Sequence, residues 1–192
     1  MAKKRRNVTV LFSGGIDSSA CVHYFKKLKF NVDCLFVNYG QIGLKGEREA
    51  VNKLSQYFKV KTKECKVVTE IKEINGVIQG RNNLFIALGL MNFNDSHGAI
   101  GLGIHAGTKY PDCSPQFVES VQALLDIYTN GNVSVDCPFI NMSKEEIVHY
   151  CKTNKVPFKL TFSCERSSKK PCGKCDKCLE LKKIYESAGI KN

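Results

Sequence analysis

Short apolar runs alternate with longer amphipathic stretches along the whole chain. Runs of apolar and β-branched residues predict strands, and apolar residues recurring every three or four positions predict helices. The expected strands span residues 8–12, 31–39, 60–68, 99–105 and 133–139. The expected helices span residues 18–27, 46–58, 81–93, 115–128 and 143–154, the last opened by a capping box of Ser143 and Glu146.

This regular strand–helix order predicts an α/β fold, in which a Rossmann-like parallel sheet carries helices on both faces. Ligands of such sheets bind beyond the carboxyl ends of the strands, where Ser13, Tyr39 and His105 are expected to lie. Glycines in the expected strand 99–105 predict a close backbone approach there. A chain of 192 residues with 43% hydrophobic content has the size for one sizeable core.

The segment V-T-V-L-F-S-G-G-I-D-S-S, residues 8–19, is an apolar strand that stops at two glycines before a helix. This layout surrounds a phosphate with backbone N–H groups, and the glycines let the backbone approach its oxygens. The S-G-G-x-D-S spelling is the signature of PP-loop ATP pyrophosphatases and differs from the P-loop pattern. Asp17 is positioned to hold Mg²⁺, or else to cap the helix of an ordinary strand-to-helix turn. The residues expected to contact ATP are Phe12, Ser13, Gly14, Gly15, Ile16, Asp17, Ser18 and Ser19, with Tyr39 and Gln41 after the second strand.

Four of the ten cysteines cluster near the end of the chain. Cys164, Cys172, Cys175 and Cys178 have a C-x7-C-x2-C-x2-C spacing, which can supply four thiolates to one tetrahedral ion. A closed four-thiolate shell predicts a structural Zn²⁺ site, with an iron–sulfur cluster or a redox pair as alternatives. The remaining six are expected to be small core residues: Cys21, Cys34, Cys65, Cys113, Cys137 and Cys151.

The formal charge of +11 favours polyanionic partners such as nucleic acid. A cleft for ATP and an anionic substrate needs positive charge too, and a zinc–thiolate centre offsets part of the excess, so stable nucleic-acid binding is not expected. Residues 3–6 are either a basic nucleic-acid arm or a solvated terminus, and the second is favoured. No apolar stretch reaches the length of a signal peptide or a membrane span, so a cytoplasmic protein without membrane contact is expected.

With these motifs the chain resembles the 7-cyano-7-deazaguanine synthase family, the QueC type. The likeness covers nearly the whole chain, and the matching pieces stand in the family's order. They are S-G-G-I-D-S at 13–18, N-Y-G-Q at 38–41, G-R-N-N-L-F at 80–85, Y-P-D-C at 110–113, S-K-E-E-I at 143–147 and the four-cysteine tail with its trailing helix. The resemblance implies an adenine nucleotide alpha hydrolase-like domain over residues 1–160. It also implies a zinc-binding segment with a packed C-terminal helix over residues 161–192.

The resemblance further implies an ATP-dependent ligase with ATP, Mg²⁺ and Zn²⁺ as cofactors, working as a homodimer. Such an enzyme adenylates 7-carboxy-7-deazaguanine and converts it with ammonia, through the amide, to the nitrile. Adenylation provides a good leaving group, and the loop at 13–18 is expected to hold the departing pyrophosphate. The expected catalytic residues are Ser13, Asp17, Ser18, Arg81 and Lys144, and the expected substrate contacts are Arg81, Asn82, Tyr110 and Asp112.

Several of these residues also have plainer interpretations. Arg81 could form a surface ion pair, Asp112 could be a turn residue after a proline, and Lys144 could be a solvated lysine. For His105 a structural role is favoured over that of a general base.

The chain departs from the family's usual spelling around the expected substrate pocket. Ile42 and Gly43 stand where basic residues are usual, and Lys109 stands before Y-P-D-C in place of glycine. Phe162 and Glu165 flank the first clustered cysteine in place of Trp and Tyr. These departures keep two alternatives open: a QueC-like antiphage-defence paralogue that transfers a deazaguanine to a protein amine, and a PP-loop tRNA-modifying enzyme.

Overall fold

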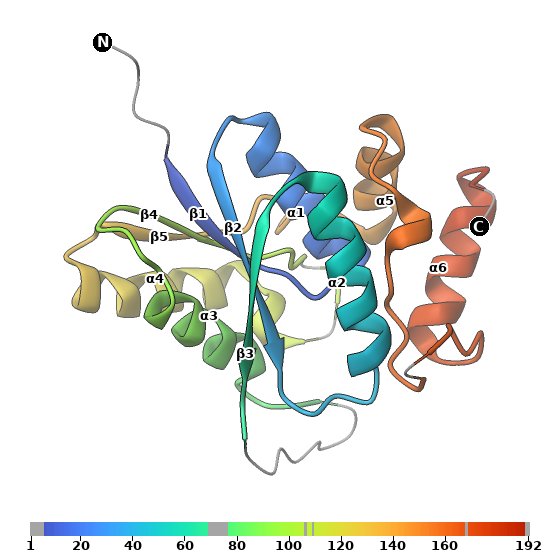
Figure 1. The fold of residues 1–192 in the computed structure, drawn as a ribbon, viewed down its shortest axis with the longest axis horizontal. Helices are drawn as coiled ribbons and strands as arrows, with labels where there is room; N and C mark the ends of the chain where they lie inside the picture. The colour runs from blue at the N-terminus through green and yellow to red at the C-terminus, as the bar shows by residue number, and fades with distance from the viewer. Residues whose placement is uncertain (1–5, 69–76, 106, 109, 168, 191–192) are drawn as a thin grey trace.

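The computed structural model describes residues 6–68, 77–105, 107–108, 110–167 and 169–190. Five parallel strands form one sheet in the order β3-β2-β1-β4-β5 (Figure 1). The strands are β1 (Asn7–Leu11), β2 (Asn31–Asn38), β3 (Lys61–Lys66), β4 (Gly98–Gly101) and β5 (Val133–Asp136). The predicted parallel α/β sheet is confirmed. The expectations for residues 3–5 and for Lys109 lie outside the described residues.

Six α-helices among the described residues cover the sheet on both faces. They are α1 (Ile16–Lys27), α2 (Leu44–Phe58), α3 (Arg81–Met91), α4 (Pro115–Thr129), α5 (Lys144–Thr153) and α6 (Asp176–Ser187). Helices α1, α2, α5 and α6 lie on one side of the sheet, and α3 and α4 lie on the other (Figure 1). The capping box of Ser143 and Glu146 is present at the start of α5, as predicted.

Central strand β1 supplies both layers of the core. Its side chains alternate between the faces, so Val8 and Val10 pack in the cluster with α1, α2, α5 and α6, whereas Leu11 packs with α3 and α4. All three side chains are buried. Of the six scattered cysteines, four are buried and Cys65 and Cys137 are half-buried.

Two expected strands are shorter than predicted. The strand expected at 99–105 ends at Gly101, which pairs with Asp136, and the last bond to β5 runs from Leu102 N to Asp136 O at 3.0 Å. The strand expected at 133–139 ends at Asp136, because the chain turns directly after it, with Ile140 N donating to Cys137 O at 3.1 Å. His105 therefore lies in the segment after β4 and not in a strand. The other predicted elements agree with the structure within about two residues at each end.

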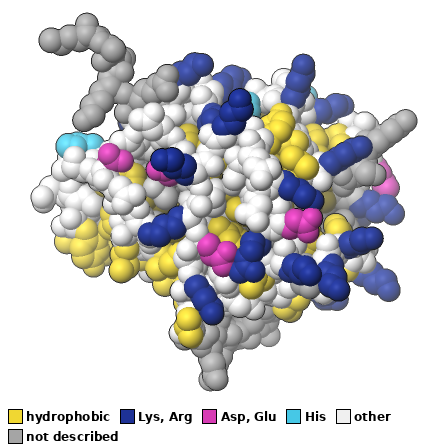
Figure 2. All heavy atoms as spheres, in the orientation of Figure 1, with side chains coloured by type: hydrophobic (Ala, Val, Ile, Leu, Met, Phe, Trp, Pro, Cys, Tyr) yellow, Lys and Arg dark blue, Asp and Glu magenta, His cyan; other side chains and the backbone are white. Residues whose placement is uncertain are grey.

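Side chains of different kinds gather over different helices (Figure 2). In the view of Figure 2, Lys and Arg are concentrated over the side that carries α2, α5 and α6, and hydrophobic side chains gather at the lower left, over α3 and α4. The large exposed apolar residues of those two helices are Leu84, Met91, Leu124, Ile127 and Tyr128. Helices α3 and α4 contain a single basic residue, Arg81, and no lysine.

Candidate functional site

A tight glycine turn joins the central strand β1 to helix α1. Gly14 has a φ of +78°, which favours glycine, and a Cβ there would lie 3.0 Å from that of Ala50 in α2. Gly15 is extended and is the N-cap, so α1 begins at Ile16, two residues earlier than predicted. Asp17 therefore lies in the first turn, and its interpretation as the N-cap is wrong.

Serine hydroxyls brace the first turn of α1. Ser18 Oγ and Ser19 Oγ both donate to the carbonyl oxygen of Gly15, at 3.1 and 2.8 Å. Ser13 Oγ lies 3.2 Å from Ser18 Oγ. The first N–H groups of a helix have no acceptors within the helix, so they are free to bind a ligand. This turn therefore combines backbone donors, the hydroxyls of Ser13 and Ser18 and the positive end of the helix dipole. Such a turn can bind a phosphate group.

A partly buried ion pair connects this turn to helix α5. Lys144 Nζ donates to Asp17 Oδ2 at 2.5 Å, and only 8% of Lys144 is exposed. The interpretation of Lys144 as a solvated lysine is therefore wrong. The other carboxylate oxygen, Asp17 Oδ1, is buried and has no hydrogen-bond partner among the described residues.

The segment after β4 presses against the same turn. A Cβ on Gly103 would lie 2.5 Å from the carbonyl carbon and oxygen of Asp17 and 2.7 Å from Ser18 N. Only glycine permits this approach, which is the close backbone approach predicted for the stretch. His105, two residues further on, is 5% exposed.

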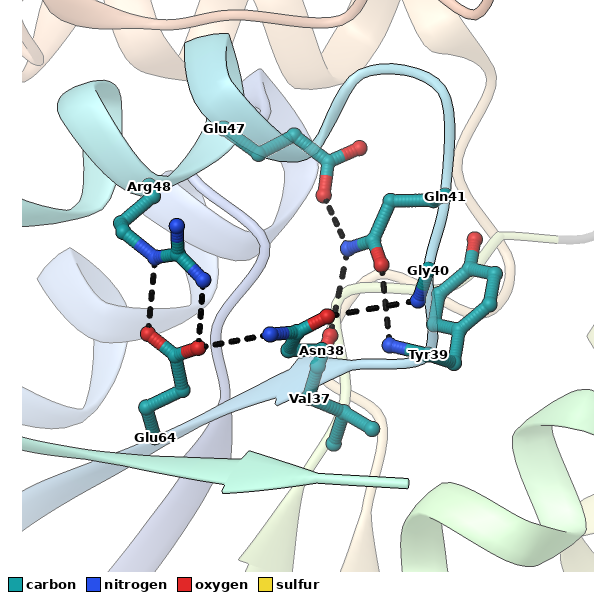
Figure 3. Close-up of polar contacts among 8 residues, drawn as sticks. All are labelled: Val37, Asn38, Tyr39, Gly40, Gln41, Glu47, Arg48 and Glu64. Carbon is teal, nitrogen blue, oxygen red and sulfur yellow. Dashed lines mark hydrogen bonds and ion pairs between the residues drawn. The ribbon is translucent and has the colours of Figure 1, made fainter. Parts of the chain in front are cut away.

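A hydrogen-bonded loop follows β2 (Figure 3). Gln41 accepts from Tyr39 N at 3.0 Å and donates to Val37 O at 3.2 Å and to Glu47 Oε2 at 2.7 Å. Burial raises the pKa of Glu47, and the Gln41 hydrogen bond opposes that shift. The ring of Tyr39 packs on Phe85 of α3 with centroids 5.4 Å apart. Tyr39 and Gln41 thus lie just beyond the carboxyl end of β2, as predicted.

Beside this loop, a second network ties α2 to the edge strand β3 (Figure 3). Arg48 donates two hydrogen bonds to Glu64, at 2.9 and 2.6 Å, and Asn38 Nδ2 donates to the same carboxylate at 2.8 Å. These bonds lower the pKa of Glu64, with the Arg48 bonds contributing most. The network positions the loop after β2 and has no residue in the cavity described below.

The Y-P-D-C segment, residues 110–113, is hydrogen-bonded to the first turn of helix α3. Asn82 N donates to Asp112 Oδ2 at 3.3 Å, and Asn82 Nδ2 donates to Asp112 O at 3.0 Å. Asp112 thus accepts from the first turn of α3. Arg81, Asn82 and Tyr110 line the cavity, whereas Asp112 does not. No carboxylate among the described residues forms an ion pair with Arg81.

These parts surround one cavity of about 280 Å³ at the carboxyl ends of the strands. It contains most of the residues expected to contact ATP or substrate. They are Phe12, Ser13, Gly15, Asp17, Ser18, Tyr39, Gln41, Arg81, Asn82, Tyr110 and Lys144. Of the other expected contacts, Gly14, Ile16 and Ser19 belong to the turn but not to the lining, and Asp112 lies behind Asn82.

The C-terminal segment closes one side of the cavity. Phe162, Ser163 and Glu165 contribute to the lining, and so do Lys177, Glu180 and Leu181 of α6. Lys177 Nζ lies 5.9 Å from the ring centroid of Tyr110, across the opening. Sequence reasoning did not assign the α6 residues or Glu47, because nothing in their local spelling shows that they face a cleft.

The four clustered cysteines converge as predicted. Their Sγ atoms all lie within 4.8 Å of one another, and those of Cys164 and Cys175 are 4.0 Å apart. Tetrahedral zinc thiolates need sulfur separations of roughly 3.8 Å, so the cluster has the right size for one ion. The N–H groups of Lys174 and Cys175 donate to Cys172 Sγ and lower its thiol pKa to about 6. A thiolate so stabilised is a ready metal ligand.

Known proteins match nearly the whole chain. The family profile described as "Queuosine biosynthesis protein QueC" matches residues 7–78 and 68–189. The chain belongs to the QueC family. A 7-cyano-7-deazaguanine synthase of Acetivibrio thermocellus is 32% identical, over 96% of this chain and 95% of the relative. A 7-cyano-7-deazaguanine synthase of Prochlorococcus marinus strain MIT 9301 is 31% identical, over 97% and 96%.

Solved structures share the fold of this QueC-family chain. A predicted subunit of tRNA methyltransferase from Methanocaldococcus jannaschii superposes with a TM-score of 0.53 at 22% identity, covering 76% of this chain and 75% of that one. A 4-thiouridine synthetase crystallised with RNA and ATP superposes with a TM-score of 0.55 at 16% identity, covering 96% and 50%. These likenesses confirm the α/β fold. No helix in the described part of the chain has the length and apolar content needed to cross a membrane.

Proposed function

We propose that this chain is an ATP-dependent carbon–nitrogen ligase, which adenylates 7-carboxy-7-deazaguanine and converts it with ammonia, through the amide, to 7-cyano-7-deazaguanine. The observation that carries the proposal is the cavity in which the PP-loop meets the ion pair of Asp17 and the buried Lys144. The full-length similarity to proteins named 7-cyano-7-deazaguanine synthase supports the choice of substrate.

The PP-loop residues act on the phosphates. Backbone N–H groups of the first turn of α1, with the hydroxyl of Ser13 and that of Ser18 once it turns away from Gly15 O, hold the pyrophosphate while the substrate carboxylate attacks the α-phosphorus. Lys144, held beside the loop by Asp17, neutralises charge on the departing group. Such donors are preorganised, so they stabilise the transition state without reorganising. The ribose and adenine lie toward Tyr39 and Gln41 at the end of β2.

Arg81, Asn82 and Tyr110 contact the second substrate from α3 and the Y-P-D-C segment. The Arg81 guanidinium is free of ion pairs among the described residues, so it is available for a carboxylate or a phosphate. Asp112 acts indirectly, through its two hydrogen bonds to Asn82. Ammonia then attacks the adenylated carboxylate, the C–N bond forms and AMP leaves. A second ATP then adenylates the amide oxygen with release of pyrophosphate, and loss of AMP and a proton gives the nitrile.

The residues fit both metals that the proposal requires. Asp17 Oδ1 is a buried carboxylate oxygen without a partner among the described residues, which suits Mg²⁺, since Mg²⁺ prefers oxygen ligands. Bound Mg²⁺ would neutralise charge on the nucleotide phosphates. Cys164, Cys172, Cys175 and Cys178 would hold Zn²⁺ in a closed shell, so that ion would have a structural role.

The proposal includes a cytoplasmic homodimer, formed through the apolar face of α3 and α4. That face carries the exposed side chains of Met91, Leu124 and Ile127, and its two helices contain one basic residue in a chain of net charge +11. Two copies can therefore meet there with little charge repulsion, whereas contact through the Lys-rich faces would be repulsive.

Mass spectrometry of a reaction with ATP, Mg²⁺, ammonium and 7-carboxy-7-deazaguanine tests the proposed chemistry. We expect the 7-cyano product from the wild type and from Asp95→Ala, a change in an exposed loop, but not from Asp17→Ala. Formation of AMP without amide or nitrile would contradict ammonia as the acceptor, and a search for a modified protein amine would follow. Absence of any adenylation would contradict the proposal as a whole.

A further inference from the structure

Three buried polar atoms of the cavity have no hydrogen-bond partner among the described residues. They are Asp17 Oδ1, His105 Nδ1 and Thr108 Oγ1, and all three residues line the cavity. An unpartnered buried polar atom costs free energy, so folded proteins keep such atoms where a ligand, an ion or water completes them. Mg²⁺ accounts for Asp17 under the proposed function. The Cys113 thiol, a weak hydrogen-bonding group, is the neighbour of the Thr108 hydroxyl, and nothing yet accounts for His105.

His105 is held at this position by the backbone. The residue is 5% exposed, and it lies two positions after Gly103, whose backbone packs directly against the carbonyl group of Asp17. A larger residue than glycine would separate the segment from α1. The imidazole is therefore built into the wall beside the PP-loop, and it is not a surface side chain that happens to face a cavity.

The surroundings of His105 favour an uncharged ring. Burial lowers the pKa of His105, and Lys144 and Lys177 add to the shift, while Asp17 and Glu180 oppose it. These are the charged groups that face it from α1, α5 and α6. A neutral imidazole presents one N–H donor and one acceptor nitrogen, so it suits a neutral ligand with its own donors and acceptors.

The sheet order assigns His105 to one half of the cavity. The PP-loop follows the central strand β1, Tyr39 follows β2 on one side, and His105 follows β4 on the other. With the phosphates over β1 and the adenosine on the β2 side, the β4 side remains for the second substrate.

We propose that His105 and Thr108 are a specificity-determining pair, which binds the heterocyclic ring of the second substrate by hydrogen bonds in the β4 half of the cavity. This rests on the proposed function, in which that ring is a 7-deazaguanine with N–H and C=O groups on its edge. A site that hydrogen-bonds such an edge rejects analogues that lack the matching groups, because the buried partners are then left unpaired.

Pyrophosphate exchange driven by 7-carboxy-7-deazaguanine tests the pair, because it reports adenylation alone. Thr108→Val removes the hydroxyl at nearly constant shape, and His105→Phe removes both ring nitrogens. We expect each variant to raise the KM for the heterocycle about tenfold, while the KM for ATP stays unchanged. We also expect each to discriminate less than the wild type against an analogue with an adenine-like edge. His97→Phe, an exposed histidine just before β4 at its opposite end, is the matched control.

The outcomes separate this inference from the proposed function. A wild type that neither binds the heterocycle nor exchanges pyrophosphate contradicts the function, and the pair with it. A wild type that exchanges, with variants that keep its KM and its discrimination, overturns the pair alone. If the variants raise the KM for ATP and leave that for the heterocycle unchanged, the two residues bind the nucleotide and the inference is wrong. Should His105→Phe fail to fold, the isosteric Thr108→Val still decides the result.

Discussion

At the scale of single residues, the ion pair of Asp17 and Lys144 joins the PP-loop to helix α5. Both charged groups lie at the start of a helix, α1 and α5, and the fold brings them within 2.5 Å across 127 positions of sequence. Lys144 is buried, so removal of Asp17 would leave a buried ammonium group without its ion-pair partner. Such pairs are sensitive to the loss of either member and are retained where a ligand uses them.

Lys144→Met should lower both stability and adenylation. We expect the free energy of unfolding to fall by about 1–3 kcal/mol, because Asp17 loses its cation. We expect adenylation to slow about 100-fold or more, because a preorganised positive charge beside the phosphates is lost. Denaturant unfolding and pyrophosphate exchange measure the two effects, and a double-mutant cycle with Asp17→Asn measures the coupling. If the effects of the two substitutions on the free energy of unfolding are additive, the ion pair contributes nothing to stability.

At the scale of elements, the cysteine cluster determines where α6 lies. Cys175 is the N-cap of α6 and Cys178 stands in its first turn, while Cys164 belongs to the segment that lines the cavity. One ion held by these sulfurs would join the two segments. Lys177, Glu180 and Leu181, which follow within two turns, then form the cavity wall.

Cys175→Ser should therefore lose the metal and weaken a wall of the active site. We expect zinc content near zero by elemental mass spectrometry, faster hydrogen exchange in α6, and reduced adenylation with the sheet still folded. Cys65→Ser, a half-buried cysteine in β3 outside the cluster, is the control and should keep its metal. Unchanged zinc in Cys175→Ser would rule out the four-thiolate site.

At the scale of the whole molecule, helices α3 and α4 expose apolar side chains on a face with little positive charge. The basic side chains gather over α2, α5 and α6, and the apolar ones over α3 and α4 on the opposite side of the sheet (Figure 2). Met91 is 81% exposed and Ile127 is 74% exposed. Large exposed apolar side chains from neighbouring helices mark an interaction surface.

Ile127→Glu should separate the proposed dimer. We expect light scattering to give twice the chain mass of 21.5 kDa for the wild type and the single mass for the variant, because a buried unpaired carboxylate opposes association. Leu28→Glu, which changes a leucine that is 51% exposed at the end of α1, should remain dimeric. A wild type of single-chain mass would contradict the dimer itself.

Local pattern was enough to predict the five parallel strands, five of the six helices and the two motifs, because each depends on residues close in sequence, whereas the C-terminal helix followed from the family resemblance. Hydrophobic periodicity reports burial one element at a time, and the S-G-G-I-D-S loop and the cysteine spacing each bring their own donors together. The strand at 99–105 was overextended for the same reason. Apolar residues continue past Gly101, but the partner strand ends at Asp136, and strand length depends on that partner.

The chain's own order of residues thus determined the class of fold, the glycine turn between β1 and α1 and the cluster of four cysteines in this QueC-family protein. Only the tertiary structure decided that Lys144 is buried against Asp17, that Asp112 supports Asn82 behind the cavity wall, and that His105 faces the cavity. These facts depend on contacts between elements far apart in sequence. Such contacts follow from the packing of helices on the sheet, which no local pattern of residues encodes.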